Sequence, residues 1–172
     1  MEHVRTDRLI LRSLKNSDLD DFLGYRSDPE VAKYQGFEPY SHPEAAQFIE
    51  SQKDRALLKK GEWTQIAIAL ASTDTLIGDC AVRLEDDSAE IGVTLSPNFH
   101  NKRFASEALG GLINHLNDLG LRSIFAVVDT RNLSANRLMK SLGFIVAKEN
   151  KDVPFKGSLC SEFQYVLNLN GS

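Results

Sequence analysis

The sequence predicts one α/β domain of the α+β type, in which helices flank a mixed, mostly antiparallel central sheet of about six to seven strands. Its 172 residues are enough for one sizeable core, and 42% hydrophobic and 26% charged residues are typical of a globular domain. Short apolar runs alternate with amphipathic segments from end to end. No repeat, low-complexity segment or linker divides the chain, so we expect a single domain over 1–172 with a core over about 7–168.

The first half of the chain predicts two helices and an antiparallel meander. Ser17 and Asp18 are good N-cap residues for a helix that ends near Arg26. Proline and glycine interrupt the segment 29–43, whose aromatic residues are typical of an irregular wall or lid. The other expected elements are a strand over Leu9–Leu14, a helix over Glu44–Lys59, and strands over Thr64–Leu70, Leu76–Leu84 and Glu90–Leu95.

The second half predicts a crossover connection. Apolar residues recur at intervals of three and four from Ala105 to Leu119, and Gly120 ends this helix. The chain then returns as a strand parallel to Glu90–Leu95 through a right-handed connection. This returning strand is expected over Ile124–Val128. A helix over Leu133–Leu142 and strands over Phe144–Lys148 and Glu162–Leu167 follow, and a loop that contains Pro154, Phe155 and Gly157 separates these last two strands.

A basic loop stands directly before the long helix. It reads His100, Asn101, Lys102, Arg103. The first backbone N–H groups of a helix lack intrahelical partners and lie at the positive end of the helix dipole. Because the loop adds two cationic side chains to these donors, the sequence predicts an anion site here.

The order and spacing of several short motifs resemble the GNAT superfamily of N-acetyltransferases and, within it, the ribosomal-protein N-terminal acetyltransferase branch. The resemblance covers nearly the whole chain and implies the single-domain GNAT fold, with a splayed parallel pair of strands at a cofactor cleft. The matching segments are Thr6–Arg12, Ser27–Val31, Ile77–Gly78, Glu90–Gly92, Ser96–Glu107 and Asn132–Phe144.

The resemblance implies acetyl-CoA as cosubstrate and direct attack of a primary amine on its thioester. The favoured acceptor is the N-terminal α-amine of a protein or peptide, including a ribosomal protein, and a small-molecule amine is the other option. Main-chain groups of a splayed strand would hold the pantetheine arm and the acyl oxygen, and Asn132 would bind that arm or serve as a plain helix N-cap. The implied cofactor-binding residues are Val93, Thr94, Leu95, His100, Asn101, Lys102, Arg103, Phe104, Ala105, Ser106, Asn132 and Arg137.

Several positions depart from the family pattern. Asn101 and Arg103 replace the two glycines of the family's phosphate loop. Met139 stands where many members carry the tyrosine that protonates the departing thiolate, and Ala135 replaces a serine of some relatives. Asn tolerates left-handed backbone better than Arg does. Either Arg103 keeps an ordinary helical backbone and its guanidinium supplements the amide donors, or the loop binds CoA weakly.

Two residues are candidates for proton transfer. Glu90 is the best candidate base, acting directly or through a water, and its alternative role is a polar residue on the solvated face of its strand. Ser134 is the candidate general acid, with simple solvent exposure as its alternative. An α-amine with a pKa of about 7.7–8.0 needs little help from a base at pH 7, whereas a lysine amine near 10.4 needs much more.

Charge and cysteine content argue against other classes of protein. A net charge of −4 lacks the basic footprint of a nucleic-acid-binding protein. No signal-like run and no stretch of roughly 20 apolar residues is present, so we expect a cytoplasmic protein without a membrane partner. Cys80 and Cys160 have no metal-ligand spacing, so we expect no metal, and Cys80 fits a small buried hydrophobe. A homodimer is compatible with the sequence.

Two other functions are weighed against the enzyme. A noncatalytic acyl-CoA-binding or sensing domain of the same fold would account for Ala135, Met139 and the altered phosphate loop. A nucleotide-binding domain of Rossmann or P-loop type would need a glycine-rich fingerprint that the chain lacks.

Overall fold

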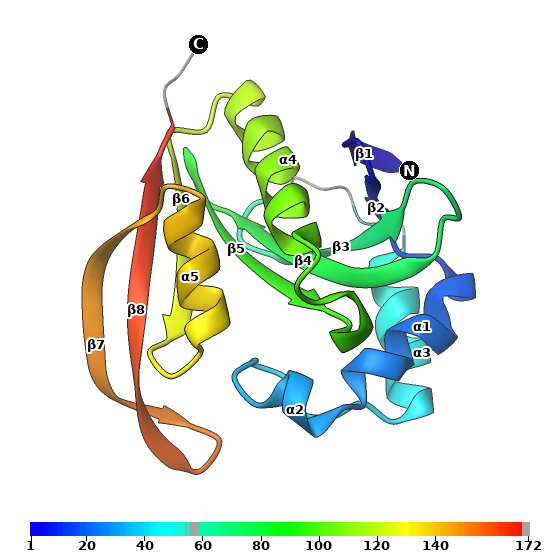
Figure 1. Ribbon diagram of the computed structural model, residues 1–172, viewed down its shortest axis with the longest axis horizontal. Coiled ribbons are helices and arrows are strands. Elements are labelled where there is room, and N and C mark those ends of the chain that lie inside the picture. Colours follow the sequence, from blue (N-terminus) through cyan, green and yellow to red (C-terminus); the bar gives the residue numbers. More distant parts are fainter. Residues whose placement is uncertain (54, 56–58, 170–172) are drawn as a thin grey trace.

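The computed structural model describes residues 1–53, 55 and 59–169, and in this part of the chain the sheet has eight strands with helices on both faces (Figure 1). The strand order is β1-β2-β3-β4-β5-β6-β8-β7, and all neighbours are antiparallel except β5 and β6, which are parallel. The strands are β1 (Glu2–Arg5), β2 (Leu9–Ser13), β3 (Trp63–Leu70), β4 (Leu76–Leu84), β5 (Ser88–Leu95), β6 (Ser123–Asp129), β7 (Ile145–Phe155) and β8 (Ser158–Asn168).

Five α-helices and two short 3₁₀ turns are described. They are η1 (Asn16–Asp18), α1 (Leu19–Arg26), α2 (Pro29–Ala32), α3 (His42–Gln52), η2 (Pro97–Phe99), α4 (Phe104–Asp118) and α5 (Leu133–Ser141). The mixed α/β fold with its parallel pair is confirmed. The strand that the sequence did not indicate is β1, whose Glu-His-Val-Arg run is too short and polar to show a strand pattern and which forms by pairing with β2.

The helix expected over Glu44–Lys59 begins and ends earlier. α3 begins at His42 after Ser41, whose backbone N–H donates to the Glu44 carboxylate at 2.8 Å, with Pro43 in the first turn. It ends at Gln52, so the predicted continuation is wrong where the chain is described. Residues 54 and 56–58 of that continuation lie outside the described residues.

The loop expected between the last two strands is a tight hairpin. β7 continues through Pro154 to Phe155, which pairs with Ser158. The turn therefore contains only Lys156 and Gly157, with φ of 47° and 78°, as a two-residue type I′ turn requires. Pro154 is tolerated because β7 is the edge strand of the sheet.

Apolar side chains fill both faces of the sheet. On one face α4 packs its stripe, including Leu109, Leu112 and Leu116, against the strands, and Cys80 is fully buried among them as expected. On the other face α1 and α3 pack Phe22 and Ile49 against β3 and β4. Helices thus cover the second face only over the amino-terminal strands (Figure 1).

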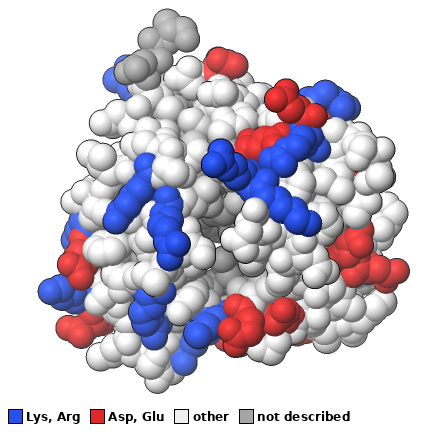
Figure 2. All heavy atoms as spheres, in the orientation of Figure 1, with Lys and Arg blue, Asp and Glu red and all other residues white. Residues whose placement is uncertain are grey.

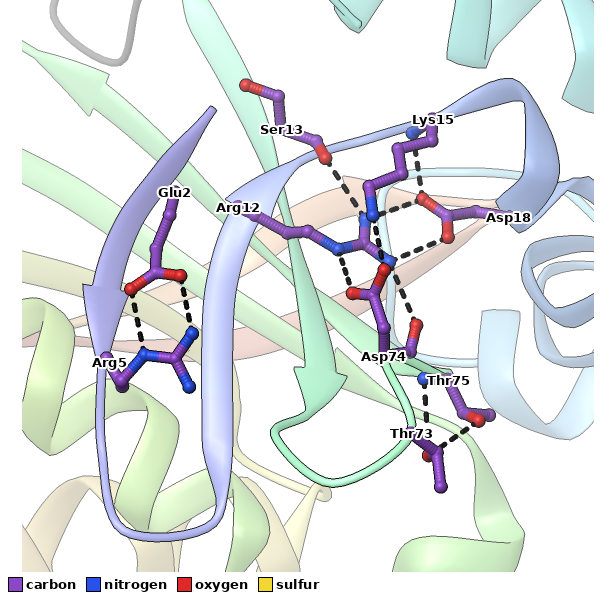
Figure 3. Close-up of polar contacts among 9 residues, drawn as sticks. All are labelled: Glu2, Arg5, Arg12, Ser13, Lys15, Asp18, Thr73, Asp74 and Thr75. Atoms are coloured by element: carbon purple, nitrogen blue, oxygen red, sulfur yellow. Dashed lines mark hydrogen bonds and ion pairs between the residues drawn. The ribbon is translucent and has the colours of Figure 1, made fainter.

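A buried ion cluster fixes the corner from which α1 starts. Arg12 donates to both carboxylate oxygens of Asp18 at 2.8 and 2.9 Å, and its Nε donates to Asp74 at 2.7 Å (Figure 3). Arg12 and Asp18 are each about 95% buried, so the loss of either would leave an unpaired buried charge. The cluster joins the β2–α1 corner to the β3–β4 turn and so fixes α1 over the sheet.

Candidate active site

A cleft opens where β5 and β6 separate. These two strands, both fully described, pair only at Ser88–Glu90 with Ser123–Phe125, and their carboxyl halves diverge, which confirms the expected splay. Figure 2 shows a hollow between α5 and the loop before α4, with Lys and Arg side chains on both sides. The exposed basic residues of these two elements are Lys102, Arg103, Arg137 and Lys140.

The backbone of β5 presents alternate polar groups to this cleft. The Ser96 amide donates to the Ile77 carbonyl on β4 at 2.8 Å. Because the bonds of an antiparallel ladder alternate between residues, the peptide groups of Thr94 also pair with β4. The N–H and C=O of Val93 and the C=O of Leu95 point instead to the side that β6 vacates.

The loop before α4 keeps a glycine-like backbone without glycine. Asn101 and Arg103 both have left-handed φ, 59° and 62°. The alternative in which Arg103 keeps an ordinary helical backbone is therefore wrong: Arg103 is the N-cap of α4, with ψ of 17°. The chain thus takes a left-handed turn at both positions before it enters the helix, although both residues carry side chains.

The first turn of α4 offers backbone donors to an anion. Its first intrahelical bond runs from the Glu107 amide to the Arg103 carbonyl at 3.0 Å, and no side chain caps the helix. The N–H groups of Phe104, Ala105 and Ser106 therefore have no partner in the part of the chain that the structure describes. Three free amides at a positive helix end fit a pyrophosphate.

The side chains of the loop have different partners. His100 Nε2 lies 2.9 Å from the Leu95 carbonyl, so this ring holds the end of β5 and is not directed at a phosphate. Lys102 donates to the Asn98 carbonyl at 3.2 Å. Arg103 is exposed, and its guanidinium contacts no acceptor among the described residues, so it is free to bind an anion.

A carboxylate in the first turn of α4 would oppose an anion, but Glu107 is neutralised locally. It accepts hydrogen bonds from the Thr6 hydroxyl at 2.6 Å and from the Arg8 backbone and guanidinium at 2.8 and 2.7 Å. Burial alone would raise the pKa of Glu107, but these bonds outweigh it and hold the pKa below its ordinary value.

The amino terminus of α5 forms the opposite side of the cleft. Asn132 is the N-cap of α5, and its side chain accepts from the Ala135 amide at 3.2 Å. Asn136 donates to the Asp129 carbonyl at 3.0 Å and accepts from the Tyr165 hydroxyl at 2.7 Å, which fixes α5 to the end of β6. Ser134 and Arg137 are exposed.

A cavity of about 400 Å³ adjoins the carboxyl half of β5 on the other face of the sheet. This volume is within the usual range for small-ligand sites. Glu90 is the only proposed catalytic residue at this cavity, and of the proposed cofactor residues only Val93 and Thr94 line it. The lining residues are Arg26, Gln35, Gly36, Phe37, Tyr40, Phe48, Trp63, Gln65, Asp79, Ala81, Glu90, Ile91, Gly92, Val93, Thr94 and Val127.

Glu90 is ion-paired at the wall of this cavity. Arg83, its neighbour across the β4–β5 ladder, donates to the Glu90 carboxylate at 2.7 Å. Arg83 Nε also lies 3.3 Å from Glu85, and the guanidinium is 5.1 Å from the Trp63 ring centre. Glu90 thus faces the cavity with a cation already bound to it.

A polar network lies in the floor of the cavity. Asp79 is fully buried and accepts from the Tyr25 hydroxyl at 2.5 Å, from Arg26 Nη2 and Nε at 2.5 and 3.1 Å, and from Gln65. Burial raises the pKa of Tyr25 well above its ordinary value, and Asp79 adds to this rise. Arg26 and Asp79 are not among the site residues predicted from the sequence, although a charged residue inside the apolar run Leu76–Val82 was a usable signal.

The outer wall of the cavity is the loop after α2. The wall expected over 29–43 is therefore present, but α2 (Pro29–Ala32) and the start of α3 form the two ends of this segment, so it is irregular only between them. Lys156, in the β7–β8 turn, donates to the carbonyls of Ala32 and Phe37 at 2.6 and 2.7 Å. Arg131, after β6, places its guanidinium 5.6 Å from the Tyr34 ring centre. Two segments distant in sequence therefore hold this wall.

The described residues contain no cluster of three or more His, Cys, Asp or Glu side chains that could hold a metal ion. No described helix is both long and apolar enough to cross a bilayer.

The comparisons with known proteins agree on the class that this fold and cleft define. The family profile of the acetyltransferase (GNAT) domain matches residues 8–145. An uncharacterized N-acetyltransferase of Bacillus licheniformis, p20, is 36% identical over 149 residues, which are 84% of this chain and 83% of that protein. The chain therefore belongs to the GNAT acetyltransferase family and is an acyltransferase.

Solved structures share the fold at low sequence identity. A GNAT-family acetyltransferase from Bacillus anthracis superimposes with a TM-score of 0.87 at 21% identity over 98% of both chains. RimL, a ribosomal L7/L12 α-N-protein acetyltransferase in complex with CoA, has a TM-score of 0.85 at 15% identity over 100% of both chains. Spermidine N-acetyltransferase from Vibrio cholerae, in complex with CoA and spermine, has a TM-score of 0.81 at 20% identity over 96% and 98%.

Proposed function

We propose that this chain transfers the acetyl group of acetyl-CoA to a primary amine, with an α-amine of a protein, peptide or amino-acid derivative as the favoured acceptor. One observation carries the proposal. The same stretch of β5, Gly92–Thr94, borders the cleft that leads to the anion loop and also lines the cavity on the other face. A thioester and an amine that entered from these two sides would meet at this strand.

The phosphate end of the cosubstrate fits the start of α4. The free amides of Phe104, Ala105 and Ser106 would bind the pyrophosphate, and the exposed cations Lys102, Arg103 and Arg137 would bind phosphate oxygens. The backbone of Val93 would hold the pantetheine arm and donate to the acyl oxygen. Asn132 acts first as the helix N-cap of α5.

The transfer itself needs one new bond and one proton relay. The neutral amine nitrogen bonds to the acetyl carbon, the carbon–sulfur bond breaks, the nitrogen gives up one proton, and the thiolate gains one. Glu90 is the proposed acceptor of the amine proton, directly or through a water. Ser134, exposed in the first turn of α5, is the proposed donor to the thiolate. Such a cytosolic cosubstrate agrees with the cytoplasmic location expected from the sequence.

Thermal unfolding with and without acetyl-CoA tests the proposal directly. A ligand that binds only the native state stabilises it by about 2.7 kcal/mol at 100 times its dissociation constant, which raises the melting temperature of a chain of this size by about 5–10 °C. Thiol release with amine acceptors then measures transfer. No shift at millimolar acetyl-CoA, or a shift without thiol release on any amine, would overturn the proposed function.

Glu90→Gln tests the proposed base. We expect the variant to lose more rate on a lysine-like amine than on an α-amine, because the lysine amine is almost entirely protonated at pH 7. Glu149→Gln, an exposed carboxylate on β7, is the matched control. An equal loss on both amines would show that Glu90 is not the base.

A further inference from the structure

The cavity on the acceptor side has walls that select among amines. We infer that the acceptor has an aromatic or branched apolar group beside its reacting primary amine and that this amine is its one cationic group. Amines with a second cationic group are rejected. This inference rests on the proposed function and narrows its class of acceptors. The inference depends on how the aromatic rings and carboxylates of the cavity are already paired.

Four aromatic side chains line the cavity. Phe37, Tyr40, Phe48 and Trp63 line it, and Phe37, Tyr40 and Phe48 also contact one another or Phe22 at ring-centre distances of 5.5–5.8 Å. Flat rings offer a large apolar contact area to another ring or a branched side chain. The space of about 400 Å³ can take such a group together with its amine.

The ring faces that could attract a cation are already used by arginines. The Arg26 guanidinium is 4.0 Å from the Phe37 ring centre and 5.9 and 6.0 Å from those of Tyr40 and Phe48. Arg83 has the same relation to Trp63 at 5.1 Å. A second cation beside these rings would gain little from them and would be repelled by the guanidinium groups.

The carboxylates of the cavity are also already paired. Asp79 accepts hydrogen bonds from three side chains, Tyr25, Arg26 and Gln65, and is fully buried. Glu90 is bound to Arg83. A polyamine needs unpaired acidic groups for the nitrogens that do not react, and this cavity does not provide them. The walls thus favour an apolar group and act against an added positive charge.

Three amides of amino acids test the inference because they share one reacting α-amine. L-phenylalaninamide carries an aromatic group, glycinamide carries no side chain, and L-argininamide carries a second, unreactive cation. Thiol release with acetyl-CoA gives kcat/KM for each. We expect phenylalaninamide to exceed glycinamide by about tenfold or more, as an apolar pocket discriminates, and argininamide to be no better than glycinamide. Spermidine is the polyamine probe and should be poorer than phenylalaninamide.

Arg83→Gln provides the variant test. It frees the Glu90 carboxylate and the Trp63 face, so the ratio of argininamide to phenylalaninamide activity should rise about three- to fivefold. Any loss of Glu90 function affects both substrates and cancels in the ratio. Arg122→Gln is the matched control, because Arg122 is 82% exposed and does not line the cavity.

The outcomes separate the inference from the proposed function. Acetylation of argininamide or spermidine at least as efficiently as phenylalaninamide would overturn the inference and leave the acetyltransferase assignment intact. An unchanged ratio in Arg83→Gln would likewise overturn the role of the paired charges. No transfer to any of the four amines by a protein that binds acetyl-CoA would overturn both.

Discussion

Arg103→Gly separates two effects that we assign to this residue, which are backbone strain in the loop before α4 and binding of the cosubstrate. Arg103 has a φ of 62°, and the left-handed region costs a residue with a Cβ about 1–2 kcal/mol. Glycine removes that strain, but its freer unfolded chain offsets about 0.4–1 kcal/mol of the gain. The guanidinium makes no hydrogen bond or ion pair to the described residues, so its loss removes no native contact. We expect the free energy of unfolding to rise by about 0.5–1 kcal/mol, or about 1–4 °C in melting temperature.

The same substitution should weaken cosubstrate binding. A hydrogen bond to a charged group contributes about 1.5–3 kcal/mol, so the dissociation constant of CoA should rise about tenfold or more. Isothermal titration calorimetry with CoA measures the affinity, and thermal unfolding of the ligand-free protein measures the stability. Stability and affinity thus change in opposite directions, which an effect on folding alone cannot produce.

Two companion variants isolate each cause. Arg103→Ala keeps a Cβ in the left-handed region, so it should lose CoA affinity without gaining stability. Asn101→Gly should change stability less, because asparagine adopts this backbone more readily. A lower melting temperature for Arg103→Gly would refute the strain argument. An unchanged CoA dissociation constant would refute the role of the guanidinium.

Three further predictions address the acceptor wall, the acid stability and the thiols. Lys156→Met removes two hydrogen bonds to the loop after α2, so KM for the amine should rise about three- to tenfold while KM for acetyl-CoA stays unchanged. An equal rise in the KM for the amine in the variant Lys151→Met, at an exposed lysine, would contradict this. The pKa of Glu107 in the folded protein is depressed, so the Glu107 carboxylate stabilises the fold above its unfolded pKa near 4.3, and this stabilisation is lost as the pH falls through the folded pKa. Glu107→Gln should therefore flatten the decline in melting temperature below pH 5. A decline as steep as in the wild type would rule this out. Burial raises the pKa of the Cys80 thiol, so a thiol reagent should modify only the partly exposed Cys160 in the native protein; rapid modification of both would contradict the buried position.

Most of the fold could be predicted because its elements carry local signals. The apolar stripe from Ala105 to Leu119 and the strand Leu76–Leu84 have the periodicity and bounds that the structure shows to within about one residue. The failures are elements that depend on partners. β1 exists through pairing with β2, and the turn Lys156–Gly157 lacks the Asn-Gly or Asp-Gly sequence that usually marks a hairpin.

The candidate site was only half predictable for the same reason. The anion loop and the start of α4 form one contiguous segment over residues 100–106, so the loop, its cations and the helix start could be predicted together. The acceptor cavity is assembled from α1, the loop after α2, α3 and the strands β3, β4, β5 and β6, and no local pattern shows that Arg26 and Asp79 meet. Glu90 was found from strand alternation, whereas its partner Arg83 depended on the register of β4 and β5.

Gly78, Asn101 and Arg103 near the cleft show two different reasons why a position can favour glycine. At Gly78 on β4 a Cβ would collide with the Thr94 carbonyl on β5, so this position needs space for two backbones to approach. At Asn101 and Arg103 the requirement is only a left-handed φ in an exposed loop. A side chain can meet the second requirement at an energetic cost but not the first. The loop before α4 therefore accepts a cationic side chain at residue 103, whereas the β4–β5 contact next to Val93 requires glycine at residue 78.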